Sequence, residues 1–557
     1  MNLGSFYVPT RVIERHPVFT REPLPDTPLP QGPGPIHVAL VKIRAPQQLN
    51  MQTLEGIGLT LAQLTLLGLN SIVVVDGHEP VTSLVDAPDR HRQRKNALQQ
   101  ADRIVSAFGT VPGPGARRLD NLLAVTCDDM SDLNNDYLDI RVANRKQLLA
   151  PLKRGIIPVI APIAYTTDKL RAIALNANDV VLTLTSELAG LAPPTISAEE
   201  DPVSVAERVA ALQREVSVDK LILLDPLGGI PSIDRPSGSH VFVNMEQEYE
   251  DIRTELSAGD IKASSSIHLR NLSLLRTALA MLPPSASAIL TAPDEAANSS
   301  RVTTSSAPEV STRRQKNPLI HNLLTDKPIF SSSLPAGRLG PSSSTTPPTS
   351  YVPTPTTSVK RGMPLTFLPD PRIQAWSPSH QHNLTLHSPT VDLPRLVHLL
   401  QSSFSRGLNS LHYLSRINPI FAGLIIAGNY EGCALFTWEH PPGAPAGTPP
   451  VPYLDKFAVL RESQGGGKGV ADMLFTAMVR TAFPEGVCWR SRRDNVVNKW
   501  YFERARGSWE LPAAEEETKN WTMFWTTEGV ERDRELWQRY VSVCAGVVPS
   551  WADGAAE

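Results

Sequence analysis

Tyr453-Leu-Asp-Lys-Phe457 opens the stretch of sequence that decides the fold, which continues through Gln464-Gly-Gly-Gly-Lys-Gly469 to Trp489-Arg-Ser-Arg492. Together these segments read as a strand, an anion-binding loop that opens a helix, and a second strand that carries arginines. Such a unit outlines a site for a phosphate-bearing cofactor and a carboxylate substrate.

The glycine-rich loop has the features of an anion-binding site. Gln464, Gly467 and Gly469 fit the pattern Q-x-x-G-x-G, and consecutive glycines let backbone N–H groups converge on an anion. A pyrophosphate would suit this place, because the N-terminus of the following helix favours negative charge. The pattern is neither a Walker A motif nor a Rossmann fingerprint, and a flexible turn is the alternative for an isolated glycine run. The cofactor-binding candidates are Gln464, Gly465, Gly466, Gly467, Lys468 and Gly469.

The order of the elements narrows the function. We predict a strand over 451–460, a helix over 469–483 and a strand over 486–492. This order resembles the β-loop-α-β unit of the GNAT acetyltransferases, which bind the pyrophosphate of acetyl-CoA in this way.

The resemblance becomes more specific at individual residues. Four segments resemble the acetyltransferase domain of the fungal N-acetylglutamate synthases, namely Leu454-Asp-Lys-Phe457, Trp489-Arg-Ser-Arg492, Asn495 with Asn498, and Trp500-Tyr-Phe502. The resemblance implies that acetyl-CoA is the co-substrate. It also implies that the acetyl group passes to the amine of L-glutamate, giving N-acetyl-L-glutamate and CoA in the first step of arginine biosynthesis.

The substrate-binding candidates are mainly basic. Glutamate has two carboxylates, so a selective site needs at least two cations on rigid elements, and arginine can grip a carboxylate through two parallel hydrogen bonds. Arg490 and Arg492 share one face of a strand, and Lys456 lies on the neighbouring strand. By resemblance Asn495 joins them, and Arg406 is a weaker match. The alternative for these cations is a solvated sheet edge.

Acetyl transfer asks little covalent chemistry of the protein. The substrate amine must lose a proton before it attacks, and holding the amine beside the thioester supplies much of the acceleration. By resemblance Tyr501 is the candidate acid for the departing thiolate, with a core aromatic side chain as the alternative, and Asn495 could orient the amine or its water. Cys488 has no evident His partner, so direct attack is favoured over an acyl-enzyme.

The first half of the chain alternates strands and helices. We predict strands over 37–43, 71–76, 155–164 and 219–224, and helices over 53–67 and 168–189. This order predicts a parallel sheet covered on both faces. It resembles the amino-acid-kinase fold, and the matching phrases are Arg154-Gly-Ile-Ile-Pro-Val-Ile160, Asn178-Asp179 and Leu223-Leu-Asp-Pro-Leu-Gly-Gly229. The predicted fold is therefore a three-layer α/β/α kinase-like domain followed by a GNAT α/β domain.

The kinase-like domain lacks the phosphate loop of an active kinase. Active members follow their first strand with Lys-x-Gly-Gly, whereas Lys42 is followed by Ile43, Arg44, Ala45 and Pro46. Proline has no N–H group to offer a phosphate. The family implies a regulatory and oligomerising role instead, with arginine as the inhibitory ligand. Residues 241–249 could line the arginine site, and an acidic helix start is the alternative.

Composition predicts the boundaries of the domains. Residues 296–317 and 331–358 are rich in Ser, Thr and Pro and read as linkers, and the apolar segment 318–330 between them should dock on one of the domains. The predicted parts are an N-terminal extension over 1–35, the kinase-like domain over 36–295, a linker over 296–360, the acetyltransferase domain over 361–545 and a tail over 546–557.

Charge and cysteine content exclude several classes of function. The net charge of −3 gives no reason to expect nucleic acid as a partner, and no apolar run reaches the length of a membrane span. The four cysteines are far apart and show no metal-binding spacing, so we expect no metal. The family implies the mitochondrial matrix, although residues 1–35 carry no clear transit helix, because Glu14 and Glu22 lie among the arginines.

Three hypotheses about the activity remain. In the first, the chain makes N-acetyl-L-glutamate, is inhibited by arginine, and forms homo-oligomers. In the second, it is mainly an arginine-sensing partner of N-acetylglutamate kinase with weak acetyltransferase activity. In the third, it is a GNAT for another amino acid, since arginines recognise carboxylates generally.

Overall fold

The computed structural model describes most of the chain after the N-terminal extension. The described residues are 34–77, 87–126, 139–167, 171–192, 207, 210–212, 214–233, 235, 238–258, 262–297, 317–329, 356–379, 384–445, 447–464, 469–511 and 521–552. Residues Ile36–Glu557 form one compact unit, which contains two large sheets, one from each half of the chain.

The first sheet has eight strands, and all neighbours pair in parallel except β11 and β12. Across the sheet they are β10 (Phe242–Asn244), β12 (Thr357–Lys360), β11 (Ser287–Thr291), β9 (Val216–Leu224), β1 (Ile36–Arg44), β2 (Asn70–Asp76), β6 (Ile157–Ile160) and β3 (Ala116–Arg118). The apolar runs of β1 and β2 are buried on both faces, as a covered parallel sheet requires.

Helices cover both faces of this sheet. On one face α2 (Met51–Leu66) and α3 (Ala87–Gly109) pack into one core, and on the other α5 (Ala177–Leu188) and α8 (Lys262–Met281) pack into a second. Asn50 caps α2 by accepting a hydrogen bond from Thr53 N at 2.7 Å. The predicted three-layer α/β/α arrangement is confirmed. Further helices are α4 (Arg145–Leu152), α7 (Met245–Ala258) and α9 (Pro293–Ala297).

Two predicted elements of this half are wrong. Residues 155–164, expected as one strand, form β6 and then β7 (Ile163–Thr166), which lie in different sheets. Pro162 separates them, because proline cannot continue a hydrogen-bonded ladder and Ile163 N instead donates to Ala161 O in a tight turn.

The second wrong element is the helix predicted over 168–189. Its described part contains β8 (Ala172–Ala174), and α5 begins only after the cap Asn176. Strands β7 and β8 belong to a smaller, mixed sheet of four strands, together with β4 (Leu123–Thr126) and β5 (Asp139–Val142). An apolar run alone did not distinguish the short strand from the first turns of the helix.

The segment between the halves contributes to the first sheet. Pro318–Thr325 forms α10, whose Leu319 is buried in the core beneath α2, so the apolar docking segment packs on the first domain as expected. Residues 357–360, which we predicted to end the linker, form β12 between β10 and β11. Their polar side chains are buried because Lys360 pairs with Asp326 and Thr357 accepts from Ile230 N, contacts that composition does not reveal.

The second sheet has seven strands and a mixed topology. In order they are β13 (Leu365–Leu368), β14 (Phe421–Ala427), β15 (Gly432–Glu439), β16 (Val451–Val459), β17 (Cys488–Arg492), β19 (Trp521–Trp525) and β18 (Gly507–Glu510). The order β16-loop-helix-β17, with β16 and β17 parallel, is the predicted acetyltransferase unit.

Helices also cover both faces of the second sheet. One face packs against α12 (Leu393–Phe404), α13 (Ser410–Ile417) and α17 (Arg534–Gly546), and the other against α15 (Val470–Ala477) and α16 (Asn498–Arg504). The helix predicted over 469–483 is interrupted, since α15 ends at Ala477 and Met478–Ala482 form a π-helical turn. A short helix, α14 (Arg461–Gln464), precedes the glycine loop.

Candidate functional site

Strands β16 and β17 separate along most of their length. Among the described residues, only Tyr453 and Cys488 pair between these strands, although each strand continues beyond this point. Beyond the pair, the described partners of β16 lie on β15 and those of β17 on β19. The sheet therefore opens between its two central strands, and backbone groups of both strands face the gap.

A β-bulge in β16 directs two charged side chains to the same face. Leu435 pairs with Lys456 and Phe436 with Leu454, so Asp455 has no partner of its own on β15. The two residues of a bulge that oppose one partner residue break the strand's usual alternation of side chains. Asp455 and Lys456 consequently both lie on the face covered by α13, where Asp455 accepts a hydrogen bond from Tyr413 and Lys456 faces the Tyr413 ring.

Asp455 is the centre of a buried ionic cluster. Its side chain is 1% exposed, pairs with Arg416, lies 3.3 Å from Lys456 Nζ, and accepts a hydrogen bond of 2.9 Å from the Tyr413 hydroxyl. Burial alone would raise the pKa of Asp455, but Lys456 and Arg416 outweigh it and hold the pKa below its usual value. Asp455 is thus a permanent carboxylate and a poor proton acceptor for the reaction.

The roles of Tyr413, Arg416 and Asp455 are not predicted by the sequence patterns. Asp455 lies in the opening stretch, where two adjacent charges inside an otherwise apolar strand could have indicated a bulge and an internal ion pair. Tyr413 and Arg416 lie on α13, whose polar and apolar residues have ordinary helical spacing. Nothing local marks them as partners of a strand some 40 residues away.

Arg490 lies on the same face, on the other side of the gap. Its terminal nitrogens donate to the carbonyls of Cys544 at 2.9 Å and Val547 at 2.7 Å, and its guanidinium stacks 4.1 Å from the centre of the Trp521 ring. Its Nε is buried without a hydrogen-bond partner among the described residues. Arg490 therefore holds the C-terminal end of α17, and a substrate carboxylate would meet an arginine already oriented by two carbonyls.

Two further substrate-binding candidates, at the end of β17 and in the turn after it, are exposed. Arg492 follows Arg490 by two residues on the same strand face and makes no ion pair with a described residue. Asn495 closes the turn after the strand, donating to Ser491 Oγ at 3.0 Å and accepting from Val497 N at 3.1 Å. Arg493 pairs with Glu510 instead. Arg492 and Arg493 are therefore both exposed at this strand end, and of the two only Arg493 has a described ion-pair partner.

Tyr501 lies on the opposite face of the sheet, in an aromatic core. Its ring centre is 5.3 Å from that of Trp489 and 5.5 Å from those of Trp500 and Phe524. Burial raises the pKa of Tyr501, so the phenol keeps its proton, as an acid must. Arg504 holds its helix against α15 through Asp472 Oδ1 at 2.8 Å. The position of Tyr501 is compatible with both of its proposed roles, as a proton donor and as an aromatic residue of the core.

The cofactor loop is described only at its ends. Gly469 adopts φ = 66°, the left-handed conformation that glycine tolerates, and begins α15 without a side-chain cap. Gln464 ends α14, and Gly465, Gly466, Gly467 and Lys468 lie outside the described residues. Within the described residues, no side chain caps the first N–H groups of α15, which suits an anion at this end.

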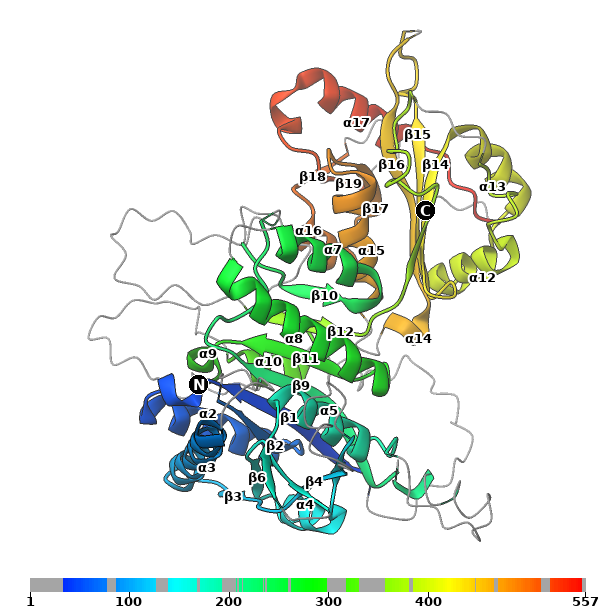
Figure 1. The fold of residues 1–557 in the computed structure, drawn as a ribbon. Coiled ribbons are helices and arrows are strands. Elements are labelled where there is room, and N and C mark those ends of the chain that lie inside the picture. The colour runs from blue at the N-terminus through cyan, green and yellow to red at the C-terminus, as the bar shows by residue number, and fades with distance from the viewer. Residues whose placement is uncertain are drawn as a thin grey trace. The chain divides into compact units, whose positions relative to one another are not determined.

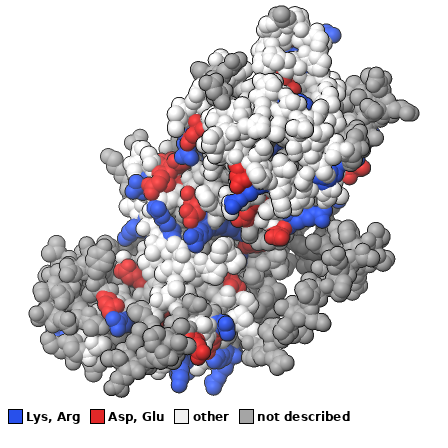
Figure 2. All heavy atoms as spheres, turned by 90° about the vertical axis from the view of Figure 1, so that its right-hand side faces the viewer, with Lys and Arg blue, Asp and Glu red and all other residues white. Residues whose placement is uncertain are grey.

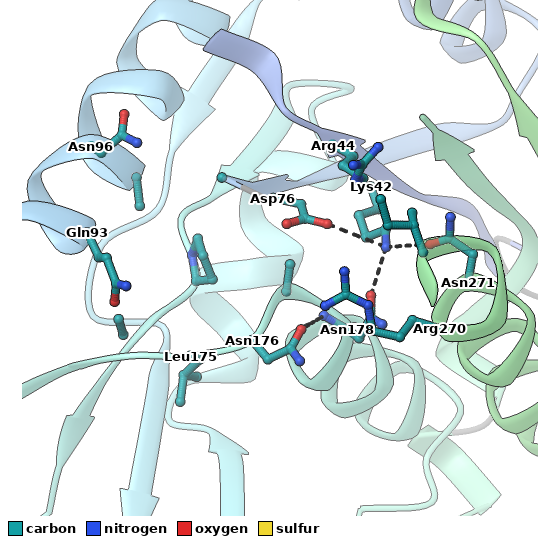
Figure 3. A pocket seen from close by; sticks show the side chains of 16 residues that line it. Lys42, Arg44, Asp76, Gln93, Asn96, Leu175, Asn176, Asn178, Arg270 and Asn271 are labelled. Carbon is teal, nitrogen blue, oxygen red and sulfur yellow. Dashed lines mark hydrogen bonds and ion pairs between the residues drawn. The ribbon is translucent and has the colours of Figure 1, made fainter. Parts of the chain in front are cut away.

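The first domain has a separate cavity at the ends of β1 and β2. It has a volume of about 70 Å³ and is lined by Lys42, Asp76, Asn178, Arg270 and Asn271, among others. Figure 3 shows the Lys42 ammonium between Asn178 Oδ1 at 2.7 Å and Asn271 Oδ1 at 3.0 Å, with Asp76 at 3.5 Å. Burial lowers the pKa of Lys42, and Asp76 partly offsets this effect.

The loop beside this cavity offers no phosphate cradle in its described N–H groups. Ala45 N donates to Asp76 O, Gln48 N to Ala45 O and Leu49 N to Pro46 O. Arg44 is buried in an ion pair of 2.6 Å with Asp225. Because these N–H groups are already bonded and Pro46 has none, the loop is built as a closed turn rather than as an ATP-binding loop.

A larger cavity of about 660 Å³ lies beside α7. Phe242, Asn244, Gln247 and Glu248 from the segment 241–249 line it, together with acidic residues of α7 and with Arg480 of the π-helical turn. Glu246 and Glu248 also occupy the first turn of α7, so this segment is both a cavity wall and an acidic helix start. Asn244 Nδ2 bonds to Met363 O at 2.8 Å, which joins this wall to the start of the second half.

Three further observations bear on the class of protein. None of the helices that the structure describes is both long and apolar enough to cross a membrane. In the described parts of the chain, no three His, Cys, Asp or Glu side chains gather as a metal site would need. Figure 2 shows acidic and basic side chains close together on one face, in keeping with the balanced net charge.

The opened sheet, with a helix that begins at a glycine loop between its two separated strands, defines an N-acetyltransferase. Residues 379–546 match the family model of the N-acetyltransferase of N-acetylglutamate synthase. The chain is 46% identical to the mitochondrial amino-acid acetyltransferase of Aspergillus clavatus and 47% identical to that of Aspergillus oryzae, over 99% of this chain and 82% of each relative. The chain belongs to this fungal family of amino-acid acetyltransferases, the N-acetylglutamate synthases.

The likeness to solved structures is more distant. N-acetylglutamate synthase from Neisseria gonorrhoeae, complexed with coenzyme A and N-acetyl-glutamate, aligns with a TM-score of 0.46 and 14% identity. The alignment covers 88% of this chain and 95% of the bacterial one.

Proposed function

We propose that this enzyme transfers the acetyl group of acetyl-CoA to the amine of L-glutamate, giving N-acetyl-L-glutamate and CoA, as the first step of arginine biosynthesis. The observation that carries the proposal is the position of Lys456, Arg490 and Arg492 on one face of the sheet, on both sides of the β16–β17 gap. Two carboxylates on a short chain need cations on separate rigid elements, and the gap separates them.

Acetyl-CoA would bind with its pyrophosphate on the loop 464–469 and the N-terminus of α15. The uncapped start of α15 at Gly469 supports this assignment. The pantetheine arm would then lie in the gap, where backbone groups of the separated strands can hold it and stabilise the tetrahedral oxyanion. In this proposal the protein binds and orients both substrates and excludes water.

Proton transfers would accompany the attack of the amine on the thioester. The amine gives up a proton, the C–N bond forms, and the C–S bond breaks as the thiolate leaves. Tyr501 would protonate that thiolate. Burial raises the pKa of Tyr501, which keeps the phenol protonated before the reaction but makes it a weaker acid. Asn495 would orient the amine or its water. Asp455 is locked between cations, so the base is another group or water.

Arginine would inhibit the enzyme from the cavity beside α7. Glu248, Asp251 and Glu255 line this cavity, and carboxylates are the natural partners of a guanidinium. Glu248 already pairs with Arg235 at 2.6 Å, so a bound arginine could replace that side chain. Arg480 from the acetyltransferase half lines the same cavity, which supports an effect on the catalytic half.

The cellular setting follows from the relatives. We propose the mitochondrial matrix as the location, because the relatives are named mitochondrial. Homo-oligomers and a complex with N-acetylglutamate kinase are further parts of the proposal, as is a regulatory role for the kinase-like domain.

The test is CoA release by the purified chain, followed with a thiol reagent. We expect release with acetyl-CoA and glutamate, much less with aspartate, and a decrease on addition of arginine. No release above background would refute the enzyme proposal and favour an arginine-sensing partner. Equal rates with aspartate would refute the specificity and favour a GNAT for another amino acid.

A further inference from the structure

The chain after α17 crosses the face that carries the candidate cations. We call residues 547–552 the C-terminal strap. Its first residue, Val547, accepts a hydrogen bond from Arg490 on β17. At its far end Ser550 O accepts from Asn409 N at 3.0 Å, and Ala552 N donates to Gly407 O at 2.8 Å. The strap thus runs from one side of the β16–β17 gap to the loop between α12 and α13, as Figure 1 shows for the red chain.

Trp551 covers Lys456. The Lys456 ammonium lies 5.3 Å from the centre of the Trp551 ring and 5.6 Å from that of Tyr413. Arg406, the weaker candidate on the α12–α13 loop, lies 5.4 Å from the same Trp551 ring. Trp551 is 5% exposed and Lys456 is 4% exposed, so these side chains are packed rather than solvated. Aromatic faces attract cations within about 6 Å.

Ser550 reaches the same lysine through a chain of polar contacts. Its hydroxyl lies 2.9 Å from His412 Nδ1 and accepts from Arg416 Nε at 3.4 Å. Arg416 pairs with Asp455, which lies 3.3 Å from Lys456. A long flexible lysine is therefore held from two directions, by the Trp551 ring above it and by Ser550 through Arg416 and Asp455.

We propose that Trp551 and Ser550 are positioning residues of the amino-acid site, and that the C-terminal strap forms its roof. The inference rests on the proposed function, in which Lys456 binds a substrate carboxylate. A lysine carries about 2 kcal/mol of side-chain rotamer entropy, so a roof that orders it before the substrate arrives improves binding of the amino acid. The strap contacts Arg490, Lys456 and the loop between α12 and α13. None of these belongs to the proposed cofactor site, so binding of acetyl-CoA should not depend on the strap.

The test compares half-saturation by the two substrates in strap variants. Trp551→Ala should raise the glutamate concentration for half-maximal rate by about tenfold, from a lost cation–π contact of about 1–2 kcal/mol. The acetyl-CoA concentration for half-maximal rate should stay unchanged. Trp551→Phe should keep the glutamate value close to that of the wild type, because the phenyl ring retains a cation–π contact. Ser550→Ala should raise the glutamate value less than Trp551→Ala does. Val548→Ala is the matched control, because Val548 lies in the same strap and is 58% exposed.

A second readout does not depend on turnover. Lys456 should be protected from an amine-modifying reagent in the wild-type chain and the Val548 variant, and become reactive in the Trp551→Ala variant, as measured by peptide mass spectrometry. Near-wild-type half-saturation by glutamate in an active Trp551→Ala variant would overturn only this inference. Absence of glutamate-dependent CoA release by the wild-type chain would instead overturn the proposed function, and the inference with it.

Discussion

Replacement of Asp455 by Asn should destabilise the acetyltransferase half strongly. The change keeps the shape and the hydrogen-bond acceptor for Tyr413 but removes the carboxylate charge between Arg416 and Lys456. At an effective dielectric constant of about 20, unit charges at the 3.3 Å separation of Asp455 and Lys456 attract by about 5 kcal/mol. Because Arg416 keeps Glu439 at 3.5 Å, we expect a net loss of about 3–5 kcal/mol, typical of breaking a buried pair.

Tryptophan fluorescence during urea unfolding measures this loss selectively. All nine tryptophans lie between Trp376 and Trp551, so the signal reports on the second sheet even if the two halves unfold separately. Tyr413→Phe is the control, which removes one hydrogen bond and should lower the free energy of unfolding by only about 1 kcal/mol. Asp455→Asn combined with Lys456→Met should recover part of the loss, because one unpaired buried cation is removed.

A small effect would refute this account of the cluster. If Asp455→Asn lowers the free energy of unfolding by less than about 1 kcal/mol, the carboxylate contributes no more than an ordinary hydrogen bond. If the double variant loses as much free energy of unfolding as the two single changes added together, or more, Lys456 does not depend on Asp455 for its burial.

Other predictions concern catalysis and pH. Arg490→Ala should raise the glutamate concentration for half-maximal rate by about two orders of magnitude or more, as expected for a lost buried charged contact. Binding of acetyl-CoA should be nearly unchanged. Loss of both glutamate and acetyl-CoA binding would indicate that α17 has detached, because Arg490 holds the carbonyls at its end. Tyr501→Phe should lower kcat by about 10²-fold or more with KM unchanged if the phenol is the acid. A kcat equal to that of the wild type in this variant would show that Tyr501 is only an aromatic residue of the core. The pKa of Asp455 is lowered, so the unfolded chain takes up the proton first on acidification. Its stabilisation should be complete above the unfolded carboxyl pKa of about 3.9 and be lost below it, and Asp455→Asn should flatten this acid limb in fluorescence-detected unfolding.

Local pattern was enough for five of the fifteen strands in the two large sheets. Apolar runs bounded by turn residues correctly predicted β1, β2, β9, β16 and β17, because a buried strand needs continuous apolar side chains wherever it lies in the chain. Interruptions of a strand or helix within one apolar run were not predicted from the sequence. The turn at Pro162 and the π-helical turn after Ala477 depend on which neighbour each segment packs against.

The sequence by itself determined the class of enzyme and the residue types of its site: a glycine loop at a helix start, a lysine on one strand and arginines on the next. These follow from local chemistry, since anions need N–H groups and carboxylates need cations. Only the tertiary structure decided how those cations are held. The bulge at Asp455, the carbonyls that grip Arg490 and the strap that places Trp551 over Lys456 join residues up to about 145 positions apart. No local pattern encodes such contacts, because they exist only once the second sheet has packed against α13 and α17.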